Sequence, residues 1–184
     1  MGRRPIQPAN SGKVVQLKSK CGSKKSNQTE ASTSFFGGFF MPVTSLVSPE
    51  LIAAYRATHF CSTVAPGVTL TLLVDKHDLQ LGQLQGLYQV SSCAVITAYN
   101  PYSEPTADAT NVAAQKSLIL AIDAMGLHWF PASGVDPDGI WPAEPSLLVL
   151  GINIAQADAL AHRFGQNAYV FCDESAIPSL QLCR

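Results

Sequence analysis

The sequence predicts an α+β protein with enough apolar residues to fill the core of one ordinary domain. Of its 184 residues, 47% are hydrophobic and only 14% are charged, a balance typical of a globular chain. Between residues 93 and 172, four apolar segments with strand character and two with helical period follow one another in the order β-α-β-β-α-β. Glycine, proline or polar residues separate these segments and mark their ends.

Two elements are expected before this unit. Ser48 and Pro49 predict the start of a helix over 49–59, because Ser favours the N-cap and Pro the first helical position. An alternating segment rich in Val, Thr and Leu then predicts a strand over 68–74. Residues 75–90 carry glycines among Gln and Leu, and they fit either a short helix or a loop.

The first strand of the unit, over 93–98, ends in a polar Asn-Pro-Tyr-Ser turn. Thr106 is expected to cap the following helix, and Gly126 is expected to end it. A short strand over 127–131 comes next. The loop predicted over 132–143 is dense in Pro, Gly and Asp.

The second half of the unit repeats the order of strand, helix and strand. A strongly apolar segment predicts a buried strand over 146–152. Asn153 and Gln156 have the spacing of a capping box at the start of the next helix, and Gly165 is placed to end it. Residues 168–172 predict the last strand.

This order of elements is typical of a ferredoxin-like fold, in which a four-stranded antiparallel sheet carries two helices on one face. The helix over 49–59 and the strand over 68–74 would be additions before it. A doubly wound parallel sheet is the main alternative. It is disfavoured because no helix is predicted between the strands over 127–131 and 146–152.

The first forty residues differ in composition from the rest of the chain. They hold seven of the 12 Lys and Arg residues but only one of the 13 Asp and Glu residues. Residues 1–34 are polar and lack an amphipathic period, so they are expected to be disordered. A basic arm for nucleic acid or membrane and an organelle presequence are two interpretations. The favoured one is that translation begins at Met41.

Residues 41–184 form the second unit and are predicted to make one α+β domain. They are acidic, which argues against nucleic-acid binding except through the basic tail. No apolar run approaches the roughly 20 residues that a membrane-spanning helix needs. The five cysteines are widely spaced, and Cys93 and Cys172 lie inside apolar strands, which favours a reducing cytoplasm.

The polar end of the 93–98 strand supplies three candidate ligand-binding residues, Asn100, Ser103 and Asn111. Strand ends that lead into a helix bring backbone N–H groups and loop side chains together. The amide of Asn100 both donates and accepts, so this turn suits a carboxylate, phosphate or amide ligand. The alternative is that Asn100 only stabilises the turn itself.

Glu144 and Gln166 complete the set of candidate ligand-binding residues. Glu144 precedes a buried strand, where partial burial would raise its pKa and suit it to general acid or base chemistry. Hydrogen bonding to a loop backbone is the favoured alternative for Glu144. Gln166 follows the end of a helix, where its amide can satisfy free carbonyl groups or contact a ligand.

The remaining polar clusters point to structural roles. Asp136 and Asp138 superficially resemble a calcium loop but lack its further ligands, so a solvated turn is expected. Trp129 and Trp141 bracket the same loop and are expected to pack, although either could stack on a planar ligand. Two local pairs that include histidine supply at most two metal ligands each, so no metal or cofactor is expected: His59–Cys61 and His77–Asp78.

The order of these motifs resembles a bacterial family of proteins of unknown function, DUF3293, over residues of about 50–172. The motifs that carry the resemblance are residues 95–101, Asn111, Gly139, Trp141, residues 144–146 and residues 164–168. The family pattern often has Trp where this chain has Tyr99. The resemblance implies a small stand-alone protein and supplies no catalytic residue.

The sequence therefore predicts a small cytoplasmic protein that binds a polar small molecule, such as a nucleotide or metabolite, near Asn100 and Glu144. The alternative is a non-catalytic interaction module that associates with itself or with another protein. Neither interpretation makes the protein an enzyme, and Glu144 is the one acid or base candidate.

Overall fold

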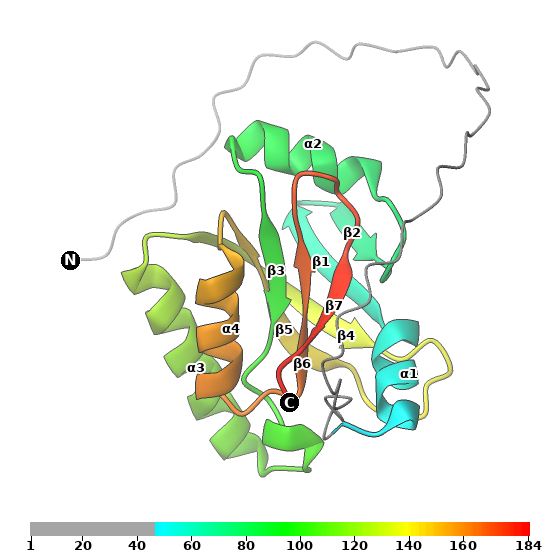
Figure 1. Cartoon of the computed structure of the whole chain (residues 1–184). Coiled ribbons are helices and arrows are strands. Elements are labelled where there is room, and N and C mark those ends of the chain that lie inside the picture. The colour runs from blue at the N-terminus through cyan, green and yellow to red at the C-terminus, as the bar shows by residue number, and fades with distance from the viewer. Residues whose placement is uncertain (1–46) are drawn as a thin grey trace, which may run out of the picture. The chain divides into compact units, whose positions relative to one another are not determined.

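The computed structural model describes residues 47–184, so the expectations for residues 1–40 and for a start at Met41 lie outside the described residues. The described chain forms an α+β structure of helices and antiparallel strands (Figure 1). In chain order, its elements are α1 Pro49–Ala57, β1 His59–Ala65, β2 Val68–Leu72, α2 Leu79–Tyr88, β3 Cys93–Ile96, α3 Asp108–Ala124, β4 His128–Val135, β5 Glu144–Leu150, α4 Ile154–Arg163, β6 Ala168–Cys172 and β7 Ser179–Leu182. A single 3₁₀ turn, Pro101–Ser103, lies between β3 and α3.

The seven described strands form one sheet in the order β2-β1-β4-β5-β3-β6-β7. Every pair of neighbours is antiparallel, which excludes the parallel doubly wound alternative. The connection from β3 to β4 runs through α3 and leaves β5 between them. The connection from β5 to β6 runs through α4 and leaves β3 between them.

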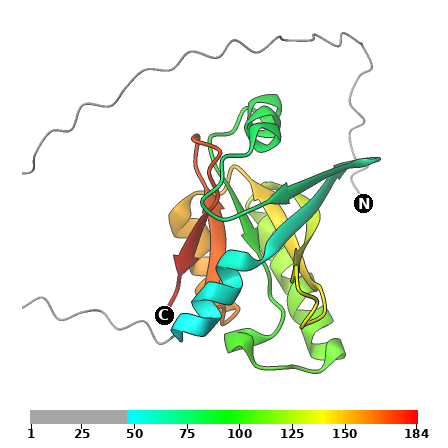
Figure 2. The same cartoon turned by 90° about the vertical axis from the view of Figure 1, so that its right-hand side faces the viewer.

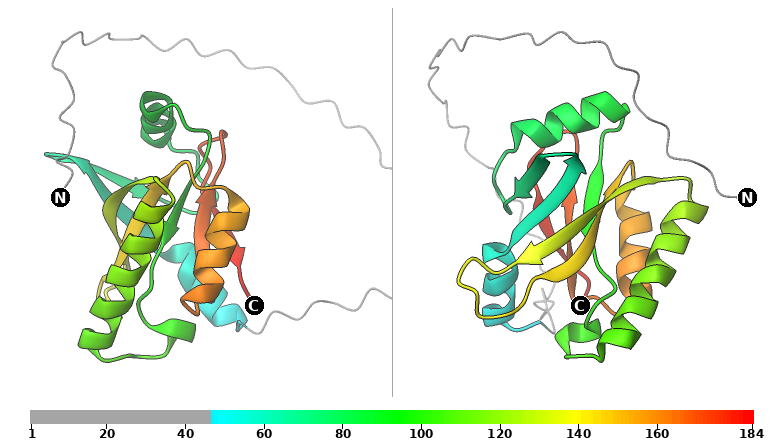
Figure 3. Two further views of the ribbon diagram at one scale, coloured as in Figure 1. Left: turned by 90° about the vertical axis from the view of Figure 1, so that its left-hand side faces the viewer. Right: turned by 180° about the vertical axis from the view of Figure 1, so that it is seen from behind.

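Both faces of the central strands are buried, and alternate side chains face opposite sides of the sheet. On β3, Ala94 and Ile96 pack into a core with α3 and α4. These two helices lie next to each other over one face of the sheet (Figures 1 and 3). Cys93 and Val95 face the other side, and Cys93 lies opposite Cys172 of β6 in the strand register, so both thiols behave as core residues.

The core on the other face shows that the sheet is curled. It joins Leu70 and Leu72 of β2 with Leu180 of β7, although β2 and β7 are the opposite edge strands. Side chains from two opposite edges can share one core only if the sheet bends toward that face. Figure 2 shows the β1–β2 hairpin leaving the central strands at a steep angle. Leucines of α2 close the far end of this second core.

Local signals for helix ends are confirmed in several places. The Ser48 side chain accepts a hydrogen bond from the Leu51 N–H, as expected of an N-cap. Asn153 and Gln156 form the predicted capping box at the start of α4. Residues 79–88, in the segment for which helix and loop were both open, form α2 with Asp78 as its N-cap.

Other boundaries were predicted wrongly. Thr106 does not cap α3, because its hydroxyl donates to the Glu104 carbonyl and Ala107 occupies the N-cap position. β4 continues to Val135 instead of ending at residue 131, because β1 and β5 pair with its second half. The strands β1 and β7 were not predicted at all. None of the described helices is long and apolar enough to cross a membrane.

Candidate functional site

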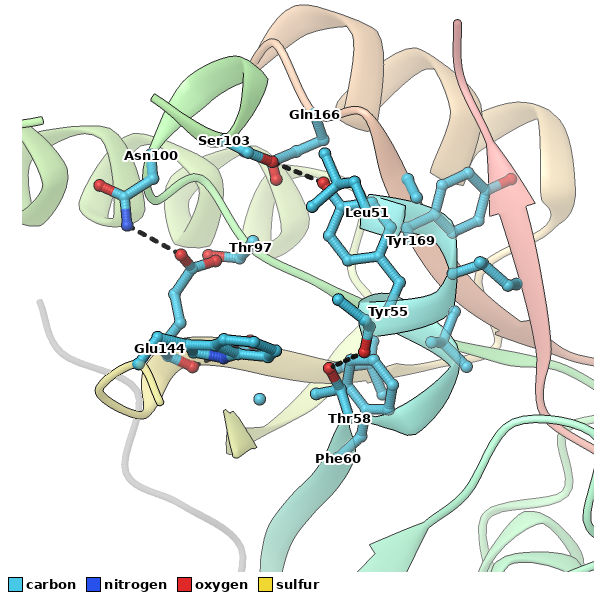
Figure 4. Close-up of a pocket in the computed structure, with 18 of the residues that line it drawn as sticks. Leu51, Tyr55, Thr58, Phe60, Thr97, Asn100, Ser103, Glu144, Gln166 and Tyr169 are labelled. Atoms are coloured by element: carbon cyan, nitrogen blue, oxygen red, sulfur yellow. Dashed lines mark hydrogen bonds between the residues drawn. The ribbon is translucent and has the colours of Figure 1, made fainter. Parts of the chain in front are cut away.

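A cavity of about 490 Å³ lies between α1 and the concave face of the curled sheet (Figure 4). Its floor follows from strand alternation. Val95 and Thr97 share one face of the chain at β3, and Glu144 and Ser146 share the same face of β5. On the same side, leucines fill the neighbouring core as far as Leu148. Toward the start of β5 the side chains on this face are the short Ser146 and the polar Glu144, and they do not fill the space under α1.

The inward face of α1 forms the roof of the cavity. Leu51, Ala54, Tyr55 and Thr58 follow one another at the spacing of one helical face, and all four line the cavity. No residue within α1 is buried. The apolar stripe of this helix therefore covers a hollow instead of a packed core.

Glu144 provides the carboxylate of the cavity. Its Oε2 accepts a hydrogen bond of 2.9 Å from Asn100 Nδ2, as Figure 4 shows. Burial raises the pKa of Glu144, while the hydrogen bond from Asn100 and the nearby side chain of Thr97 act in the opposite direction. Among the described residues that line the cavity, Glu144 is the one with a carboxylate, and none is Lys, Arg or His.

Asn100 is held in place by a network with Asn111. The backbone N–H of Asn100 donates to Asn111 Oδ1 at 2.9 Å, and Asn111 Nδ2 donates to Asn100 Oδ1 at 3.0 Å. Asn100 Oδ1 also accepts from the Thr106 N–H. Asn111 was expected to be a ligand-binding residue of this turn. It is 3% exposed and supports Asn100 from behind, without lining the main cavity.

The turn that carries Asn100 and Ser103 has an unusual backbone. Asn100, Tyr102 and Ser103 have φ values of 46°, 59° and 61°, a region that costs side-chain-bearing residues roughly 1 kcal/mol or more each. The turn is fixed from outside, since the Tyr102 N–H donates to the Gly165 carbonyl at 2.7 Å. Strain of this kind persists where surrounding contacts over-determine the conformation.

Ser103 connects this turn to α1. Its Oγ lies 2.5 Å from the Tyr55 hydroxyl and accepts a hydrogen bond of 3.1 Å from Asn167 Nδ2. Tyr55 thereby joins the roof of the cavity to the strained turn. The equivalent anchor at the other side of α1 is an ion pair between Arg56 and Asp75, both exposed.

Comparison with known families identifies the segment that holds the five predicted site residues. Residues 96–169 match the family model described as a protein of unknown function, DUF3293. This matched stretch, residues 96–169, is called the DUF3293 segment below. The resemblance stated from the sequence is thus confirmed, over a shorter range than about 50–172. Searches of curated proteins and of solved structures found no match.

The DUF3293 segment runs from the end of β3 into β6 and includes Asn100, Ser103, Asn111, Glu144 and Gln166. It leaves out α1 and β1, which supply much of the roof and one wall of the cavity. The site is therefore built jointly by the DUF3293 segment, by residues that precede it, and by Val170 and Leu180, which follow it.

Gln166 lies in the cavity wall, but its amide nitrogen already donates hydrogen bonds to the backbone of the DUF3293 segment. Its Nε2 donates to the carbonyl oxygens of Tyr99 and Phe164 at 3.0 and 3.3 Å. The structure thus gives Gln166 the expected role of satisfying free carbonyl groups at a helix end. A ligand would meet its side chain without gaining a new donor from it.

The loop after β4 supplies the aromatic side of the cavity mouth. The expectation of a solvated turn was wrong for Asp136, which is buried and accepts hydrogen bonds from the Ile140 and Trp141 N–H groups. This arrangement fixes Trp141, which lines the cavity. Trp129 packs against the core under α3, as expected.

Three residues that line the cavity were not predicted from the sequence: Tyr55 of α1, Phe60 of β1, and Thr58, which joins the two elements. The regular spacing of α1 indicated an amphipathic helix, but nothing local indicates what lies beneath it. Within residues 47–184, no group of three or more His, Cys, Asp or Glu side chains is arranged to hold a metal ion.

Proposed function

We propose that this protein binds a small molecule in the cavity between α1 and the concave face of the sheet, beside Asn100 and Glu144. One observation carries the proposal: the inward face of α1 covers a hollow of about 490 Å³ into which a partly buried carboxylate projects. Burying apolar surface normally stabilises a helix by roughly 25 cal/mol per Å² of surface removed from water. The face of α1 over the cavity lacks this stabilisation. A ligand would restore that burial.

The composition of the cavity wall supports this function. Sites for small molecules are commonly hollows of roughly 300–1,000 Å³ with apolar and aromatic walls and a few polar groups. Here Leu51, Phe60 and Trp141 belong to the apolar part, while Glu144 and Asn100 form a polar pair. The strained turn at residues 100–103 adds support, because such backbone clusters at functional sites.

A filling mutation in the roof tests the proposal on the full chain. Ala54 lines the cavity, whereas the adjacent Ala53 is exposed on the same helix. We expect a thermal-shift screen of nucleobases, nucleosides and common metabolites to find compounds that raise the Tm of the wild-type protein. The same compounds should raise the Tm of Ala53→Trp but not of Ala54→Trp.

Two results would contradict the proposal. One is a screen in which no compound raises the Tm. The other is a set of compounds that stabilise Ala54→Trp and Ala53→Trp equally, since their binding would then not involve the cavity.

An interaction module is the second candidate function, favoured by exposed leucines on α2. Leu79 and Leu87 are 66% and 76% exposed, and large exposed apolar side chains are common at docking surfaces. If this surface mediates self-association, light scattering should detect a dimer that Leu87→Glu converts to a monomer. A strictly monomeric wild-type protein would argue against self-association.

Two finer structural inferences accompany the proposal. The strand order β4-β5-β3-β6, with α3 and α4 on one face, supports a ferredoxin-like central unit. The four cysteines within the described residues are free thiols, which supports a reducing compartment such as the cytoplasm.

A further inference from the structure

The charges around the cavity limit what it can hold. Glu144 is the one carboxylate among the described residues of the lining, and no Lys, Arg or His accompanies it. A phosphate or carboxylate placed there would face Glu144 with no cation to neutralise it, and like charges at short range repel strongly where water is partly excluded. The cavity is therefore suited to neutral or positively charged molecules.

The hydrogen-bond donors around the cavity are largely committed to protein acceptors. The hydroxyls of three lining residues each donate to a backbone carbonyl oxygen: Thr58, Thr97 and Ser146. Asn100 Nδ2 donates to Glu144, and Gln166 Nε2 donates to two carbonyls. Two neutral donors of the lining have no acceptor among the described residues, the indole N–H of Trp141 and one of the two hydroxyl hydrogens of the Tyr55–Ser103 pair, and neither carries a charge that would neutralise an anion.

Two aromatic side chains lie opposite Glu144, together with Leu51 and Thr58. Figure 4 shows Asn100 and Glu144 at one end of the cavity and the rings of Tyr55 and Phe60 toward the other. Trp141 contributes a third ring to the lining. Aromatic rings favour flat partners through offset stacking and attract cations to their faces.

Resting on the proposed function, we infer that the ligand is a flat aromatic or heteroaromatic amine, whose protonated nitrogen pairs with Glu144 and whose ring packs against the aromatic wall. The protonated nitrogen of the ligand would supply a positive charge beside Glu144, where the described lining has no Lys, Arg or His. Oε2 of Glu144 is oriented for it by Asn100, and charge-assisted hydrogen bonds of this kind are about twice as strong as neutral ones. The inference excludes phosphorylated nucleotides as ligands of this cavity.

Three probes with one ring system and different charges test this inference. Tryptamine carries a protonated amine, tryptophol a hydroxyl and indole-3-propionate a carboxylate on the same indole. We expect calorimetry on the full chain at neutral pH to give at least about tenfold tighter binding of tryptamine than of tryptophol, and no binding of indole-3-propionate.

Substitution of the carboxylate provides the second arm. Glu144→Gln keeps the side-chain shape and an acceptor for Asn100 but removes the charge. It should weaken tryptamine binding about tenfold and leave tryptophol binding nearly unchanged. Glu174→Gln is the matched control, because Glu174 is exposed and does not line the cavity. It should alter neither affinity.

A pH series separates pairing with Glu144 from nonspecific attraction. Tryptamine remains protonated as the pH falls, so its affinity should drop as Glu144 becomes protonated and should stay flat in Glu144→Gln. The other titratable groups near Glu144 are Tyr55 and Tyr169 in the cavity, and Tyr99 and Asp108 in a smaller hollow on the other side of Asn100 and Glu144. These groups are present in both proteins.

Three outcomes would overturn the inference: preferential binding of indole-3-propionate, unchanged tryptamine affinity in Glu144→Gln, or no binding of any of the three probes. The proposed function is tested separately by the thermal-shift screen with Ala54→Trp, so its failure is distinguishable from the failure of this inference. If compounds bind only when the cavity is open but show no preference for positive charge, the proposed function stands and the inferred class of ligand is wrong.

Discussion

Asn100 and Glu144 are 44 positions apart in the chain, yet Asn100 Nδ2 donates to Glu144 Oε2 at 2.9 Å. The sheet register explains this contact. β3 and β5 are antiparallel neighbours with Ile96 paired to Leu147, so residues that follow β3 meet residues that begin β5. The same register places the only carboxylate in the described lining of the cavity next to a turn in which Asn100, Tyr102 and Ser103 all have positive φ.

Asn111→Ala should lower the free energy of unfolding by about 2–3 kcal/mol. The substitution removes the two hydrogen bonds that Asn111 Nδ2 donates, to Asn100 Oδ1 and to the Thr106 carbonyl, and it leaves the Asn100 N–H without its acceptor. Chemical denaturation measures the change. Thr110→Ala, at an exposed neighbouring position of α3, should change stability by less than about 0.5 kcal/mol. Equal effects of the two substitutions would mean that the Asn100–Asn111 network does not stabilise the fold.

Gly165→Ala should destabilise the protein by about 1–3 kcal/mol. Gly165 has φ +65°, and an added Cβ would lie 3.1 Å from Pro101 Cβ and 3.1 Å from Tyr102 Cζ. Gly86 offers the opposite case, since it is exposed in α2 and has open space where a Cβ would go. Gly86→Ala should stabilise the protein by roughly 0.5–1 kcal/mol. Thermal unfolding of the two variants should shift in opposite directions.

Glu144 should make stability depend on pH in a defined direction. Burial raises its pKa in the folded state, so the folded protein binds a proton more readily than the unfolded chain. Its contribution to the free energy of unfolding therefore increases as the pH falls from above the raised pKa toward the ordinary carboxyl pKa. Glu144→Gln should be more stable than wild type at neutral pH, with the difference shrinking on acidification.

Denaturation by urea at a series of pH values measures that difference. Hydrogen bonds lower the pKa of Glu50 and of Asp173, which acts in the opposite direction, but both groups are present in both proteins and cancel in the comparison. A difference that is constant with pH would show that Glu144 titrates as an ordinary carboxyl.

Asp136→Ala should loosen the loop that carries Trp141. The Asp136 carboxylate accepts from the N–H groups of Asp138, Ile140 and Trp141, so its removal should cost about 1–3 kcal/mol of stability. Any ligand of the cavity should also bind more weakly. Asp138→Ala is the control, because the Asp138 side chain is exposed. If both variants bind and unfold like wild type, Asp136 does not organise the loop.

Local signals in the sequence were sufficient for much of the helical structure. The cap at Ser48 and the capping box at Asn153 depend on atoms within three residues of one another, so their spacing alone predicts them. Thr106 shows the limit of this reasoning. It has the right residue type for a cap, but Asn100 Oδ1 engages its N–H and its hydroxyl turns back to Glu104.

The candidate site was predictable in part for the same reason. A polar turn after an apolar strand pointed to Asn100 and Ser103, and a carboxylate before the next apolar strand pointed to Glu144. Tyr55 and Phe60 carried no comparable signal, because their role depends on α1 and β1 lying over the concave face of the sheet. The strands β1 and β7 were missed because neither alternates cleanly between buried and exposed positions.

The sequence by itself determined the elements whose causes are local: the helix caps, the strands that are apolar on both faces, and the polar turn after β3. The tertiary structure decided the sheet order, the curl that joins β2 to β7 in one core, and the cavity under α1. The physical reason is that caps and periodicities depend on neighbours a few residues away. Burial instead depends on which distant surfaces meet, and the register between Ile96 and Leu147 brings Asn100 to Glu144.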